Sequence, residues 1–195
     1  MRYDAQHKQQ TRERILQEAA REIRAEGPHQ VGVAGVMARA GLTHGGFYAH
    51  FASKDDLIAA AIDQMFVEAR ERMAKEIEGR TPAEALAGYI GFYLSPAHRD
   101  ARNTGCPLPF LAADLPRLTD EARARFAAGA EGLRQRIADQ LSALGREEPE
   151  AEASSVVSEL VGALSLARAE PDRTTSDAIL ARSKAALLRR LGLES

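Results

Sequence analysis

Apolar residues recur at intervals of three and four along the whole chain, and this spacing most limits what the chain can fold into. Alternating apolar and polar residues, typical of a half-buried strand, are scarce, whereas alanine, the strongest helix former, is abundant. With 195 residues, 45% of them hydrophobic and 28% charged, the chain can bury one good core or join a small domain to a larger one. The sequence therefore predicts an all-α protein.

Helix start and stop signals divide the chain into a head of short helices and a body of long ones. A first helix should end before Gly27-Pro28, a second should cover 33–40, and a third, with Thr43 as its N-cap, should end near His50. Longer helices are expected to start near Ser53, Thr81, Thr119, Glu148 and Thr174. We expect a three-helix helix-turn-helix DNA-binding domain over 1–54 and a helical bundle for ligand binding and dimerisation over 55–195.

Location, charge and cysteine content narrow the class of protein. No apolar run approaches the ~20 residues that span a bilayer, and the N-terminus lacks the apolar core of a signal peptide, so we expect a cytoplasmic protein without a membrane partner. The net charge is −2, but residues 1–54 carry 8 Lys or Arg against 5 Asp or Glu, which permits a polyanion-binding head on an acidic body. Cys106 is the single cysteine, which excludes an intrachain disulfide and a CxxC metal site. We expect neither a metal nor a cofactor.

Two adjacent glycines, Gly45 and Gly46, interrupt the third expected helix in the stretch AGLTHGGFYAHFASKDDL (40–57). Each glycine costs a helix roughly 1 kcal/mol relative to alanine, so the pair needs a reason. Without side chains the start of this helix can approach a duplex closely, where its N–H groups and dipole favour phosphate, while Phe47 and Phe51 face inwards. The alternative is that the glycines serve only the turn, through positive φ angles or tight packing.

These residues resemble the TetR-type bacterial transcriptional repressors, in the pieces TRERILQEAAREI, AEG, VGVAGVMARAGL and THGGFYAHFASKDDL between Thr11 and Leu57. The resemblance implies a three-helix head, a linking fourth helix, and a variable helical body that dimerises through its last two helices and binds a small ligand. The chain departs from the family pattern at Gly32, where Ser or Thr usually caps the second helix, and at Val36-Met37, where Ile-Ala is usual.

By position, the resemblance places DNA contacts on one group of residues in the head. They are Thr43, His44, Gly45, Tyr48, His50 and Lys54. We add Gly46, from the argument on close approach, and Arg39 as a further phosphate contact. Each side chain has a simpler alternative: Tyr48 and His50 as satisfied core residues, and Lys54 as a solvated charge at a helix start.

Aromatic, sulfur-containing and polar side chains in the body are the candidates for a ligand site in the bundle. They are Phe66, Met73, Tyr89, Phe92, Tyr93, His98, Cys106 and Phe110, and plain core packing is the alternative for each. Cys106 follows Arg99 and Arg102, and nearby guanidinium groups would lower its thiol pKa and make it reactive towards electrophiles. An inert buried cysteine is the other interpretation.

The last two helices carry wide apolar faces that suggest a homodimer, which would hold two recognition helices about one DNA turn apart. These faces include Val157, Leu160, Leu164, Leu180 and Leu187, and packing against the body is the alternative. We therefore expect a repressor released from a palindromic operator by a small molecule or an electrophile whose identity the sequence does not give. Two other classes are an enzyme with Cys106 as nucleophile and His98 as base, for which no oxyanion hole is evident, and a helical interaction module without DNA affinity.

Overall fold

The computed structural model describes residues 2–194, and within this range the chain forms nine α-helices, three 3-10 helices and no strand. The predicted all-α fold is confirmed. The elements are α1 (Arg2–Glu26), η1 (Pro28–Gln30), α2 (Val33–Arg39), η2 (His44–Ala49), α3 (Lys54–Ile77), α4 (Pro82–Tyr93), α5 (Pro96–Asp100), α6 (Leu108–Leu111), η3 (Leu115–Arg117), α7 (Asp120–Ala143), α8 (Pro149–Ala169) and α9 (Arg173–Leu191).

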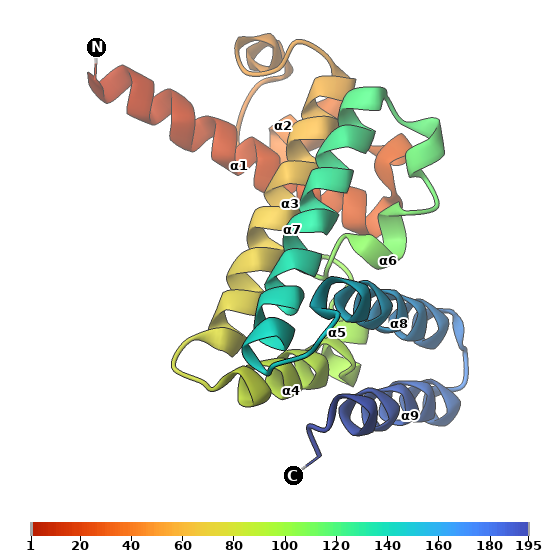
Figure 1. The fold of residues 1–195 in the computed structure, drawn as a ribbon. Coiled ribbons are helices and arrows are strands. Elements are labelled where there is room, and N and C mark those ends of the chain that lie inside the picture. Colours follow the sequence, from red (N-terminus) through yellow and green to blue (C-terminus); the bar gives the residue numbers. More distant parts are fainter. Residues whose placement is uncertain (1, 195) are drawn as a thin grey trace.

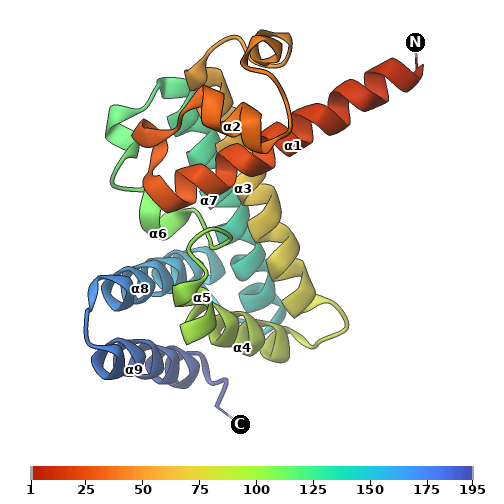
Figure 2. The same ribbon diagram turned by 180° about the vertical axis from the view of Figure 1, so that it is seen from behind.

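Two long helices, α3 and α7, lie side by side and run most of the length of the molecule (Figures 1 and 2). At one end, α1, α2 and η2 form the head, and the N-terminal part of α1 projects away from the rest (Figure 1). At the other end, α4 crosses below the pair, while α8 and α9 pack against each other and α8 packs against α7. Helix α3 therefore belongs to both ends, because it also packs against α1.

A single hydrophobic core joins the two ends. It continues from Ile15 and Phe47 in the head, through Leu57 on α3, to Leu133 on α7 and Leu160 on α8. Because closely packed interiors transmit small displacements, the head cannot move independently of the helices that it packs against.

Capping side chains fix where the long helices start. The Ser53 hydroxyl accepts a hydrogen bond from the Asp56 N–H at 3.1 Å, as expected for the N-cap of α3. Thr81 and Glu84 form a complete capping box at the start of α4, and Thr119 caps α7. The predicted starts of these helices are confirmed.

The third helix of the head differs in detail from the prediction. It is the 3-10 helix η2, and Thr43, although it stands at the N-cap position, makes no capping hydrogen bond through its side chain. The Thr43 carbonyl instead accepts a hydrogen bond from the Gly46 N–H at 3.1 Å. The tighter 3-10 turn satisfies the backbone here and leaves the Thr43 hydroxyl free.

Candidate DNA-binding surface and effector cavity

The glycine pair lies at the tip of the head with room around it. Neither Gly45 nor Gly46 has a positive φ angle, and a Cβ atom built on Gly45 would meet no atom within 4 Å. At Gly46 a Cβ atom would make only ordinary contacts, 3.7 Å from the Met37 side chain and 3.9 Å from the Thr43 hydroxyl. The turn therefore does not require glycine for conformation or packing, and close approach by an outside partner remains as the reason for the pair.

The aromatic residues beside the pair divide between the core and the surface. Phe47 and Phe51 are buried, and their rings stack with centroids 5.6 Å apart, as predicted. Tyr48, in contrast, is 71% exposed, which removes the alternative of a core tyrosine. Thr43 and His44 are also exposed at the start of η2. The head thus presents hydroxyl and imidazole groups around a bare backbone, the combination that DNA contacts use.

His50 is half-buried and linked to α1. Its carbonyl accepts a hydrogen bond from Arg12, whose guanidinium also lies 4.2 Å from the centroid of the Phe51 ring. Burial lowers the His50 pKa, and the positive charges of Lys8 and Arg12 lower it further. Among the described residues its Nδ1 atom is buried without a hydrogen-bond partner. The backbone of His50 therefore fixes η2 against α1, and this contact does not use its imidazole ring.

Two cations of the head are held by other parts of the chain. Arg39 pairs with Glu22 on α1, and the same carboxylate accepts a hydrogen bond from the Gly32 N–H at 3.0 Å. Glu22 thus fixes both ends of α2 to α1. Its hydrogen bond with the Gly32 N–H takes the place of the side-chain cap that glycine cannot provide. Lys54 donates from Nζ to the His29 carbonyl at 3.0 Å, so it is not simply a solvated charge at the start of α3.

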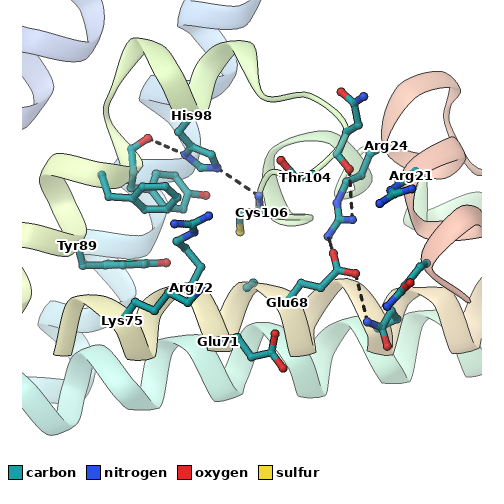
Figure 3. A pocket seen from close by; sticks show the side chains of 16 residues that line it. Arg21, Arg24, Glu68, Glu71, Arg72, Lys75, Tyr89, His98, Thr104 and Cys106 are labelled. Atoms are coloured by element: carbon teal, nitrogen blue, oxygen red, sulfur yellow. Dashed lines mark hydrogen bonds and ion pairs between the residues drawn. The ribbon is translucent and has the colours of Figure 1, made fainter. Parts of the chain in front are cut away.

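A cavity of about 420 Å³ opens between α1, α3, α4 and the segment 101–107 (Figure 3). Its volume falls in the usual range of small-molecule sites, ~300–1,000 Å³. Tyr89, Phe92, Tyr93, His98 and Cys106 line it, so the structure brings these five candidate residues together.

The other three candidates lie elsewhere. Phe66 packs edge-on against Phe126 with ring centroids 5.4 Å apart, and it also fills the space beside Gly129. Met73 is buried in the hydrophobic core, and Phe110 packs against that core. None of the three lines the cavity, and we remove them from the candidate ligand site.

Sequence reasoning missed the polar residues of the cavity. Gln17, Arg21 and Arg24 come from α1, Gln64, Glu68, Glu71, Arg72 and Lys75 come from α3, and Asn103 and Thr104 precede the cysteine. Their spacing along α3 is ordinary for a solvated helix face, and their role becomes visible only once α4 and segment 101–107 are placed over it.

Arg24 reaches from the head into the cavity wall. Its side chain is 1% exposed, with Nη2 2.7 Å from the Glu68 carboxylate on α3 and Nε donating to the Gly105 carbonyl at 3.0 Å. The Nη2 contact has the distance of an ion pair without the alignment of a good hydrogen bond. One buried guanidinium therefore connects the head, the linking helix and the segment that carries Cys106 (Figure 3).

His98 holds the segment next to Cys106. Its Nδ1 lies 2.8 Å from the Tyr93 carbonyl and its Nε2 accepts a hydrogen bond from the Cys106 backbone N–H at 3.2 Å, so the proton of the neutral ring resides on Nδ1. Burial lowers the His98 pKa to about 4. Its Nε2 lone pair is already used and cannot take a proton from the thiol. The enzyme alternative with a Cys106–His98 pair is therefore wrong.

The expected activation of Cys106 by Arg99 and Arg102 is also wrong. Arg99 turns away, donating from Nη1 to the Ser176 hydroxyl at 2.7 Å and pairing with Asp177 and Asp100. Burial raises the Cys106 pKa, and this effect outweighs the opposing interactions with Tyr93, Leu108, Arg168 and Arg24. The thiol is protonated at neutral pH, as in the inert interpretation.

The apolar faces of the last two helices point mainly into their own protomer. Leu160, Leu164, Leu180 and Leu187 are buried in the core, and Val157 packs against it partly buried. These apolar side chains are therefore explained by packing against the body, the alternative given in the sequence analysis. These buried residues are therefore not available to a second protomer.

Two further findings concern the described residues as a whole. No helix among them is long and apolar enough to cross a membrane. Within residues 2–194, no group of three or more His, Cys, Asp or Glu side chains is placed to hold a metal ion.

Comparisons with known proteins agree on the head and the fold. Residues 15–61 match the family described as "Bacterial regulatory proteins, tetR family". A TetR transcriptional regulator from Chloroflexus aurantiacus is 25% identical with a TM-score of 0.81, over 96% of this chain and 96% of that one. The reduced form of E. coli NemR has a TM-score of 0.79 at 20% identity, over 91% and 95% of the two chains. A TetR-family regulator from Agrobacterium tumefaciens has a TM-score of 0.77 at 24% identity, over 92% and 98%. No curated protein matches the sequence.

A helix-turn-helix head of this form, set on a helical body, defines a DNA-binding transcriptional regulator. The head belongs to the TetR family of bacterial transcriptional regulators and the whole chain has the fold of such a regulator, which confirms the resemblance seen in the sequence. Because this is a family of regulators and not of enzymes, membership also confirms that the chain is not an enzyme.

Proposed function

We propose that the protein is a cytoplasmic, ligand-responsive repressor that binds a palindromic operator as a homodimer and is released when a small molecule occupies the cavity. The observation that carries this proposal is the composition of the cavity wall. Gln17, Arg21 and Arg24 belong to α1 of the DNA-binding head, whereas Tyr89, Phe92 and Cys106 belong to the body. A molecule in the cavity therefore touches both parts.

Release requires unequal affinities for two conformations. A ligand shifts an equilibrium only by the difference between its affinities for the two states, and a shift from 1:99 to 99:1 needs a difference of about 10⁴-fold. We assign residues 1–54 to DNA binding and 55–195 to ligand binding and dimerisation, with α3 as the link. Since the Cys106 thiol is buried and protonated, the effector that we propose binds without a covalent bond.

We place the dimer surface on the outer faces of α8 and α9. Leu166 on α8 is 64% exposed, and Ser158 and Gly162 follow the same stripe at intervals of four residues. On α9 the outward positions include Ala181 and Ala185, and such small residues allow helices to approach closely. Sedimentation should give a mass of about twice 21.1 kDa, and Leu166→Glu should shift the protein towards monomer. A wild-type monomer at tens of micromolar would contradict the dimer.

The DNA-binding proposal is tested by a side chain at Gly45. Fragments selected from genomic DNA supply the operator, and Gly45→Leu should abolish binding to it while leaving thermal stability unchanged or slightly higher, because the site has space and leucine is the better helix former. Each good hydrogen-bonded contact with a base that the leucine prevents should cost ~1–3 kcal/mol of binding free energy. Gly132→Leu on α7 is the matched control, since a Cβ atom there also meets nothing within 4 Å. A folded Gly45→Leu protein with full operator affinity would refute the proposed approach of η2.

A further inference from the structure

The positive charges of the cavity outnumber its negative charges. Arg21, Arg24, Arg72 and Lys75 line it together with only Glu68 and Glu71. Glu68 pairs with Arg24, and Arg21 pairs with Glu18 outside the cavity. Among the described residues, neither Arg72 nor Lys75 has a carboxylate within 4.0 Å. Two cations of α3 thus remain available to an incoming anion.

Glu71 does not neutralise these cations. Figure 3 shows its side chain below the α3 ribbon, whereas Arg72 extends to the other side, towards His98 and Cys106. The guanidinium carbon of Arg72 lies 5.1 Å from the centroid of the Phe92 ring. Arg72 therefore packs on an aromatic face, and its donors are left for a ligand.

The inner wall of the cavity carries no charge opposite Arg72. Tyr89 and Tyr93 are buried with their pKa values raised by burial, and the Cys106 thiol is protonated. His98 is neutral at pH 7. A ligand bound here meets cations from α3 and an uncharged aromatic surface from α4.

One polar atom in this aromatic wall lacks a proper partner. The Tyr93 hydroxyl is buried and, among the described residues, has no hydrogen bond of good geometry. Its contact is with the Cys106 thiol, which is a weak acceptor. An unsatisfied buried hydroxyl has a cost of ~1–3 kcal/mol that an acceptor atom of a ligand would remove.

We propose that the cavity binds an organic anion with an aromatic or otherwise flat apolar body, the acidic group held by Arg72 and Lys75 and the body packed on Tyr89, Phe92 and Tyr93. A carboxylate or sulfonate suits the planar donors of Arg72, which can bind two oxygens at once. This assignment rests on the proposed role of the cavity as the effector site and names the chemical class of the effector.

A matched pair of fluorescent probes tests the assignment. 1-Anilinonaphthalene-8-sulfonate and N-phenyl-1-naphthylamine share their rings, and only the first carries a sulfonate. Wild-type protein should bind the sulfonate about tenfold or more tighter than the neutral probe, the size expected for one charge-assisted contact. Arg72→Gln/Lys75→Gln should remove this preference and leave the affinity for the neutral probe within about threefold. Arg70→Gln, which removes a cation of α3 that does not line the cavity, should change neither affinity.

The outcomes separate this assignment from the function on which it rests. Equal affinity for the two probes, a preference that survives Arg72→Gln/Lys75→Gln, or an equal effect of Arg70→Gln would overturn the anion site. Circular dichroism of each variant checks that the protein is folded, because unfolding itself creates binding sites for such dyes. Operator affinity is then measured with the cavity saturated by the sulfonate. If the probe binds as expected but operator affinity does not fall, the result supports the anion site and refutes the proposed effector function of the cavity.

Discussion

The contact between Arg24 and Glu68 gives a prediction about which of two partners matters more for stability. The Arg24 side chain is 1% exposed and the Glu68 side chain is 29% exposed, so the two charges differ in their access to water. We consider Arg24→Met, Glu68→Gln and the double variant. Methionine keeps most of the buried stem of arginine, and glutamine keeps the shape of glutamate, so each change removes mainly charge.

The magnitudes follow from what each substitution leaves behind. Glu68→Gln leaves a guanidinium buried without its counter-charge, for which ~3–5 kcal/mol is typical, reduced here to about 2–4 because Gly105 and Asn103 still accept hydrogen bonds from it. Arg24→Met leaves a carboxylate that water can reach and a Gly105 carbonyl without its donor, at a cost of ~1–3 kcal/mol. Once Arg24 is gone, Glu68→Gln should cost almost nothing more.

Urea unfolding at neutral pH measures all three variants. The chain has no Trp, so far-ultraviolet circular dichroism is the suitable signal. We expect the free energy of unfolding to fall more for Glu68→Gln than for Arg24→Met, and the double variant to resemble Arg24→Met. The reverse order, or costs that simply add, would show that the two charges are not coupled and would refute the role given to this pair.

Two further predictions concern His98 and Cys106. Because the His98 pKa is about 4 in the folded state and 6.5 in the unfolded chain, the unfolded state binds more protons between these values, and stability should fall by about 3 kcal/mol as the pH drops from 7 to 4. His98→Gln should remove that part of the pH dependence in urea unfolding, and an unchanged slope contradicts it. Alkylation of Cys106 at pH 7.5 should be about tenfold or more slower in the native protein than in urea, and equal rates would show an accessible, activated thiol.

The head was predictable because its signals are local. The cap at Ser53 and the inward positions of Phe47 and Phe51 depend on residues only a few positions apart, and the same holds for the Thr81 cap in the body. Over such distances the helical period fixes which side chains share a face. The 3-10 form of η2 was missed because side-chain spacing hardly distinguishes a short 3-10 turn from an α-helix.

The surroundings of Cys106 were not predictable, because they come from distant parts of the chain. Arg99 and Arg102 are its neighbours in sequence, yet the arginines that act on the thiol are Arg24 and Arg168. Arg24 meets the Gly105 carbonyl across 81 positions of sequence. A lone sequence shows which charges are near along the chain, whereas pKa values depend on which charges are near in space.

The apolar periodicity of α8 and α9 likewise predicts which side chains are buried, but not what they are buried against. It correctly marks Leu160, Leu164, Leu180 and Leu187 as buried, but it does not distinguish burial within a protomer from burial against a second one. The outward stripe instead contains small residues such as Ser158 and Gly162, which raise no apolar signal in a sequence.

The two ends of α1 suggest how an event in the cavity reaches the DNA-binding surface. At the cavity Arg24 contacts Glu68 and segment 101–107, and twelve residues earlier Arg12 binds the His50 carbonyl and covers the Phe51 ring. A helix rises 1.5 Å per residue, so these arginines are ~18 Å apart along one stiff rod. A tilt of about 3° at the cavity end therefore moves η2 by about 1 Å relative to the body. In a two-fold dimer the two heads would make the same movement, related by the symmetry axis, and the separation that must match one DNA turn would change by up to twice that amount. A ligand in the cavity that displaced segment 101–107 or Glu68, and with it Arg24, would need no larger movement than this to weaken operator binding.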